Sequence, residues 1–129
     1  MLESKHKPRI HIVEGNSETT VALTCLLEAQ ELDVACYANS DELINAQNVY
    51  SNDVIFVELD EKTPRIFKFL NRLLYLAVRP GIIIACQTAS SLEPSDLFPT
   101  GRIEVLFHPF SSRDVMSAIT RLSCNGLTT

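Results

Sequence analysis

The stretch that decides the fold is Asp53-Val54-Ile55-Phe56-Val57-Glu58, an almost continuous apolar run that ends on a carboxylate. Strands that are covered by helices on both faces have this composition, because neither side of the sheet meets water. Three other runs read the same way, namely Arg9–Val13, Gly81–Cys86 and Arg102–Phe107. Leu32–Cys36 is among the shorter runs and is more mixed, which is typical of an edge strand. We therefore predict five strands with these bounds.

Segments with helical periodicity separate these strands. We predict helices over Ser17–Gln30, Ser40–Gln47, Pro64–Val78 and Ser111–Cys124, the last of which begins at a Ser-Ser-x-Asp capping signal. In the first helix, we expect the apolar side chains to face the core: Val21, Leu23, Leu26 and Leu27. The segment 87–100 holds two prolines and no apolar stripe, so we expect at most one or two turns there. Alternating strands and helices predict a parallel, doubly wound α/β sheet.

Size and composition restrict the class of protein. The chain has 129 residues and a net charge of −5, which fits one domain over residues 8–124 with flexible ends at 1–7 and 125–129. Its basic residues are scattered, so we expect no nucleic-acid binding. We find no membrane span and no signal peptide, and we expect a cytoplasmic protein. The four cysteines lack metal-ligand spacing, and we expect each to be a small buried thiol.

Ligands of open parallel sheets bind beyond the carboxyl ends of the strands. Polar or small residues occupy these ends in the predicted sheet: Glu14 and Gly15 after the first strand, Glu58 and Asp60 at the third, Ala85 and Cys86 at the fourth, and His108 and Pro109 after the fifth. We predict that these residues form one pocket.

This order of residues resembles the receiver domains of two-component response regulators, from residue 8 to about residue 123. The resemblance implies the flavodoxin-like strand order 2-1-3-4-5, here with a short or irregular fourth helix. It also implies Mg²⁺-binding acids after the first strand, a phosphate-accepting aspartate at the third, a hydroxyl residue at the fourth and a lysine-proline pair after the fifth. The partners that it implies are a histidine kinase, an output domain or a second copy. By resemblance to receivers that dimerise there, the expected contact surface is the face of the fourth and fifth helices.

The sequence departs from the receiver pattern at four of these positions. Gly15 stands in place of a second acid, Glu58 in place of the aspartate, Ala85 in place of the hydroxyl residue and His108 in place of the lysine. A glutamate moves the nucleophile by about 1 Å or more, which spoils the geometry for attack. Mg²⁺ bound by Glu14, Glu58 and Asp60 would be weakened. We therefore expect a degenerate, non-catalytic receiver without a cofactor, which acts independently of phosphorylation.

Two other functions stay open. In the first, Asp60 accepts the phosphoryl group, with Glu14 and Glu58 as metal ligands. Against it, Glu58 would then lie inside a buried strand, where an unpaired carboxylate costs several kcal/mol. In the second, the loop from Gly15 binds a flavin or nucleotide, but it has one glycine where a dinucleotide fingerprint needs three, and Glu14 and Glu18 would repel phosphate.

Three further residues have two interpretations each. Glu58 either mimics a phosphorylated state or, with Glu14, clamps a protonated His108 and makes the pocket sensitive to pH. Cys86 is either a buried structural residue, which we favour, or a redox-sensitive thiol. His11, inside the first strand, is expected to be a core histidine with satisfied hydrogen bonds rather than a ligand.

Overall fold

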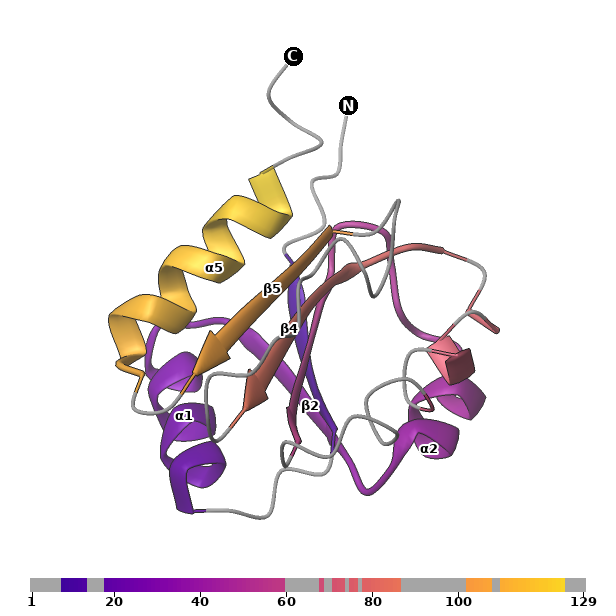
Figure 1. Cartoon of the computed structure of the whole chain (residues 1–129), viewed down its shortest axis with the longest axis horizontal. Coiled ribbons are helices and arrows are strands. Elements are labelled where there is room, and N and C mark those ends of the chain that lie inside the picture. The colour runs from indigo at the N-terminus through magenta and orange to yellow at the C-terminus, as the bar shows by residue number, and fades with distance from the viewer. Residues whose placement is uncertain are drawn as a thin grey trace.

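The computed structural model describes residues 8–13, 18–59, 68, 71–73, 75–76, 78–86, 102–107 and 110–124. The strands β1 (Arg9–Val13), β2 (Asp33–Tyr37), β3 (Val54–Leu59), β4 (Gly81–Cys86) and β5 (Arg102–Phe107) form one parallel sheet in the order β2-β1-β3-β4-β5. The helices are α1 (Glu18–Ala29), α2 (Ser40–Ala46) and α5 (Ser112–Cys124). Figure 1 shows α1 and α5 together on one face of the sheet and α2 on the other. The predicted doubly wound α/β fold and its strand order are confirmed.

The strand bounds agree closely with the apolar runs. Those of β1, β4 and β5 are confirmed, while β2 and β3 each begin and end one residue later than predicted. At β3 the reason is Asp53, whose backbone N–H closes a turn onto the Tyr50 carbonyl, 2.9 Å away. β2 is an edge strand, as predicted, and β5 is the other edge, where every residue is only partly buried.

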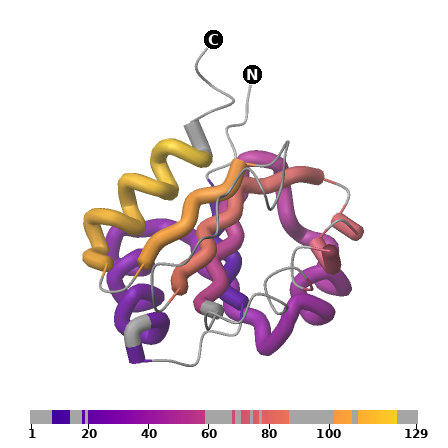
Figure 2. Tube along the Cα trace, viewed as in Figure 1, coloured from indigo at the N-terminus to yellow at the C-terminus, as the bar shows by residue number. Residues whose placement is uncertain are grey.

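Alternate residues of the strands build two cores, one on each face of the sheet. On the α1 and α5 face, the buried side chains come from the strands and from both helices: Ile10, Ile12, Val54, Phe56, Ile83, Ala85, Leu23, Leu27, Val115, Ala118, Ile119 and Leu122. On the α2 face they are Val13, Leu43, Val49, Ile55, Val57, Leu73, Leu76, Ile82, Ile84 and Cys86. The tube in Figure 2 shows the sheet between these two helical layers.

Three predictions of burial were wrong. Val21 is 55% exposed, because Leu23 and Leu27 lie one helical turn apart on the inner face of α1 and a residue two positions before Leu23 points away from that face. Cys25, two positions after Leu23, is exposed for the same reason. Cys36 is exposed because it lies on the edge strand β2. The side chain of Cys124 lies outside the described residues.

The helix ends follow local hydrogen bonding. At the start of α5, the Asp114 N–H donates to the Ser111 hydroxyl and the Ser111 N–H donates to the Asp114 carboxylate, which confirms the predicted capping signal. The helix predicted to reach Val78 ends earlier, since the N–H groups of Tyr75 and Leu76 bond to carbonyls three residues back in a tight turn. The predicted irregular segment 87–100 and the predicted flexible ends lie outside the described residues.

Candidate functional site

Glu58 lies near the carboxyl end of β3 and points toward α1. It pairs in register with Ala85 of β4, and its carboxylate accepts a hydrogen bond of 2.7 Å from the hydroxyl of Thr20 in α1. Thr20 is buried, at 1% exposure, while Glu58 is half-buried. A charged acceptor makes this a stronger hydrogen bond than a neutral pair would. The side chain at the predicted phosphoacceptor position is thus anchored to α1, a contact that the sequence did not reveal.

The two predicted site residues of β4 face opposite sides of the sheet. Ala85 is buried beside Glu58 on the α1 and α5 face. Because its side chain is a methyl group, this position offers no hydroxyl group to a ligand. Cys86 is 1% exposed and belongs to the core on the α2 face. This burial agrees with the preferred interpretation of Cys86 as a structural residue.

The other predicted pocket residues lie outside the described residues: Glu14, Gly15, Asp60, His108 and Pro109. Of the three predicted Mg²⁺ ligands, the structure therefore describes only Glu58. Among the described residues, no group of three or more His, Cys, Asp or Glu side chains could hold a metal ion.

The surroundings of Glu58 bear on whether Asp60 could be the phosphoacceptor. β3 runs through Glu58 and ends at Leu59, so Asp60 directly follows the strand. Glu58 does lie inside a strand, but it is half-buried and accepts a hydrogen bond from Thr20. The cost of burying an unpaired carboxylate, which counted against Asp60 as the phosphoacceptor, therefore does not apply to Glu58.

A groove of about 440 Å³ runs between α1 and the start of α5. Its lining is mostly apolar: Ala22, Leu23, Leu26, Phe110, Ser111, Ser112 and Val115. Phe110 also packs edge-on against the core residue Phe56, with ring centroids 6.4 Å apart.

The architecture matches solved receiver domains along nearly its whole length. A response regulator receiver domain protein from Bacillus halodurans superposes with a TM-score of 0.68 at 16% sequence identity, covering 88% of this chain and 95% of that one. This chain has a receiver-like fold. No protein-family model matches its sequence, and no curated protein matches it either.

Two further solved structures resemble the receiver-like domain equally well. A chain in the co-crystal structure of the Saccharomyces cerevisiae histidine phosphotransfer signalling protein Ypd1 and the receiver domain of its downstream response regulator Ssk1 gives a TM-score of 0.67 at 15% identity, covering 93% of this chain and 91% of that one. The receiver domain of the sensor histidine kinase PA1611 from Pseudomonas aeruginosa, crystallised with a magnesium ion in its active site cleft, gives 0.64 at 16% identity, covering 92% and 98%.

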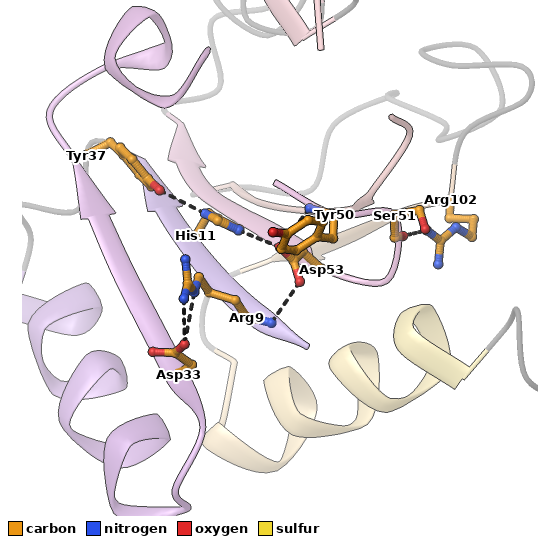
Figure 3. A network of polar contacts seen from close by, with 8 residues as sticks. All are labelled: Arg9, His11, Asp33, Tyr37, Tyr50, Ser51, Asp53 and Arg102. Atoms are coloured by element: carbon orange, nitrogen blue, oxygen red, sulfur yellow. Dashed lines mark hydrogen bonds and ion pairs between the residues drawn. The ribbon is translucent and has the colours of Figure 1, made fainter. Parts of the chain in front are cut away.

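A second polar site, which was not predicted as a unit, begins at Asp53, at the amino end of β3, and crosses the sheet through His11 to Tyr37, the last residue of β2 (Figure 3). His11 of β1 is fully buried between two partners, with Nε2 2.9 Å from the carboxylate of Asp53 and Nδ1 3.0 Å from the hydroxyl of Tyr37. The prediction of His11 as a satisfied core histidine is confirmed. The available signal was Asp53 itself, an aspartate at the head of an apolar strand.

Backbone donors complete the surroundings of Asp53. Its carboxylate accepts hydrogen bonds from the N–H groups of Arg9 and Tyr50, 3.0 and 2.9 Å away. Burial alone would raise the pKa of Asp53, but the hydrogen bonds from His11, Arg9 and Tyr50 outweigh burial and hold the pKa below its ordinary value. Asp53 is therefore ionised at neutral pH.

Arg102, the first residue of β5, connects the amino end of the sheet, where Asp53 lies, to α5. Its guanidinium donates to the carbonyl oxygens of Ser51, Arg79 and Leu122, and Figure 3 shows the contact with Ser51. Leu122 lies in the last turn of α5, so the Arg102 side chain satisfies a carbonyl that has no partner within the helix.

The described part of the chain contains no helix with the length and apolar character that a membrane span requires.

Proposed function

We propose that this chain is an atypical receiver-like signalling domain that works through protein contacts without phosphorylation of residue 58. The observation that carries the proposal is the anchored carboxylate of Glu58 beside Ala85. Phosphotransfer to a carboxylate needs an oxygen in line with the phosphoryl donor, and a misplacement of about 1 Å can cost about 100-fold in rate.

The chemistry at positions 58 and 85 supports this proposal. The hydrogen bond from Thr20 directs the longer glutamate side chain toward α1, and Ala85 has no hydroxyl with which to bind phosphoryl oxygens. Glu58 instead supplies a permanent negative charge at this end of the sheet. The domain would then hold one signalling state that does not depend on a kinase.

Contacts with a protein partner fit the groove between α1 and α5. One structural neighbour comes from a co-crystal of a receiver domain with a histidine phosphotransfer protein, so a partner of that kind is the natural candidate. The mostly apolar groove would accept an apolar side chain from such a partner. The face predicted for dimerisation, that of the fourth and fifth helices, includes residues 87–100, which lie outside the described residues.

The second candidate is a phosphorylation-competent receiver that uses Asp60. The observation in its favour is that β3 ends at Leu59, the residue before Asp60 in the sequence, while Thr20 satisfies part of the hydrogen bonding of Glu58. In that case Glu58 would serve as a metal ligand rather than as a phosphate mimic.

Intact-mass measurement separates the two candidates. The wild-type chain and the variants Glu58→Gln and Asp60→Asn are incubated with acetyl phosphate and Mg²⁺, beside a phosphorylation-competent receiver domain as a positive control. We expect a phosphoryl adduct on the control protein alone. An adduct on the wild type that disappears in Asp60→Asn would establish the second candidate. An adduct that disappears only in Glu58→Gln would contradict the proposal directly.

A further inference from the structure

Three side chains from neighbouring strands form a buried line of hydrogen bonds that the proposed function does not use (Figure 3). Tyr37 of β2, His11 of β1 and Asp53 at the head of β3 follow one another, with contacts of 3.0 and 2.9 Å. His11 and Asp53 are fully buried, and Tyr37 is partly exposed. Tyr37 is therefore the residue that connects this buried line to the surface of the protein.

The partners of Asp53 determine where His11 carries its first proton. An ionised carboxylate only accepts hydrogen bonds, and that of Asp53 accepts them from two backbone N–H groups and from the imidazole. His11 must therefore donate from Nε2. In the neutral ring Nδ1 then has a lone pair, which accepts the hydrogen of the Tyr37 hydroxyl.

Protonation of His11 would reverse only one of these bonds. A proton from water added to Nδ1 turns that nitrogen into a donor, and the Tyr37 hydroxyl, which can donate or accept, turns to become the acceptor. The new positive charge lies 2.9 Å from the Asp53 carboxylate. Both forms of the ring thus have hydrogen-bond partners on both nitrogens in the same fold.

We propose that the Tyr37–His11–Asp53 line is a proton-responsive switch, in which His11 takes up one proton in the folded chain and reverses its hydrogen bond to Tyr37. The hydrogen bond that reverses involves Tyr37, the last residue of β2. Tyr37 lies two residues before Asn39, whose side chain caps α2. This inference does not rest on the proposed signalling function.

Other charges near the switch have partners of their own or lie at the surface. They are Arg9, paired with Asp33; Asp41 of α2, paired with Arg72; Glu42 of α2, which accepts from the Ala38 N–H; and the exposed Cys36. Arg9 also acts at longer range on Asp53 and Tyr37. The ring nitrogens of His11 bond instead to Tyr37 and Asp53.

The test is a pH titration of the whole chain by NMR, following the imidazole nitrogens of His11 and the ring signals of Tyr37, with assignments from His11→Gln. We expect His11 to pass from the Nε2–H form to the doubly protonated form while the chain stays folded, and the Tyr37 signals to shift at the same midpoint. Tyr37→Phe leaves the added Nδ1–H without its acceptor, so proton binding should weaken about tenfold, moving the midpoint about one pH unit lower.

The control is Tyr75→Phe, which removes a hydroxyl from a side chain that is 71% exposed and should leave the midpoint unchanged. The proposal fails if His11 keeps one form until the chain unfolds in acid, or if Tyr37→Phe titrates like the wild type. Should Tyr37→Phe not fold, the wild type decides alone: a titration of His11 without a matching shift at Tyr37 also ends the proposal.

Discussion

Replacing Asp53 by asparagine tests whether the buried network stabilises the fold. The substitution keeps the size of the side chain but leaves one acceptor oxygen where the carboxylate has two. Among the described residues, donors from Arg9, Tyr50 and His11 converge on that carboxylate. If the amide oxygen faces Tyr50 and His11, the amide NH₂ group faces the Arg9 N–H, and two donors then oppose each other.

The expected loss of stability follows from this count. A buried donor left without an acceptor costs about 1–3 kcal/mol, and a hydrogen bond to a charged group contributes about 1.5–3 kcal/mol. We therefore expect Asp53→Asn to lower the free energy of unfolding by about 3 kcal/mol at pH 7. Because folding lowers the pKa of Asp53, its stabilisation is complete above the ordinary value of 3.8 and is lost as the pH falls through the folded value. The difference between variant and wild type should therefore shrink in acid.

Urea unfolding at pH 7 and at a series of lower pH values measures both effects. Asp33→Asn is the matched control, since Asp33 is a neighbouring carboxylate that also binds Arg9 but has 59% of its side chain exposed. That control should lose less than about 1 kcal/mol. Equal losses in the two variants, or a difference from wild type that does not change with pH, would refute the assigned role of Asp53.

Two further predictions concern packing and capping. Gly81→Ala should destabilise by about 1–3 kcal/mol in urea unfolding, because the new Cβ would lie 2.8 Å from Cβ of the buried Leu122. Leu122→Ala keeps that Cβ, so Gly81→Ala should cost about as much in the Leu122→Ala variant as in the wild type, and a cost that disappeared there would contradict this cause. Asn39→Ala removes the side chain that accepts from the Glu42 N–H and should cost about 1 kcal/mol, and an unchanged urea midpoint would show that the cap contributes nothing.

The sheet was predictable because strands buried on both faces need apolar residues at every position. That requirement explains why the bounds of β1, β4 and β5 could be read directly from the apolar runs. It could not place the start of β3, because Asp53 is as buried as its apolar neighbours but takes part in side-chain hydrogen bonds. Burial and apolar character differ at this residue, and sequence patterns report only the second.

The helix faces and the site were harder to predict, since both depend on tertiary placement. Val21 and Leu23 have similar hydropathy, and only the rotation of α1 on the sheet decides that Leu23 is buried and Val21 exposed. The same rotation brings the Thr20 hydroxyl to Glu58 across 38 positions of sequence. No local spacing contains this pairing, so the state of the predicted phosphoacceptor position could not be read from the motif.

Asp53 and Glu58 show how one strand places two kinds of chemistry. They are five positions apart, so alternation along the chain directs them to opposite faces of the sheet, and their hydrogen-bond partners among the described residues differ: β1 and the preceding turn for Asp53, and α1 for Glu58. Five strand residues span roughly 16 Å, so a substitution at Asp53 can remove its hydrogen bonds without touching the bond between Thr20 and Glu58. Alternation along a strand thus lets the two faces carry different chemistry on the same fold.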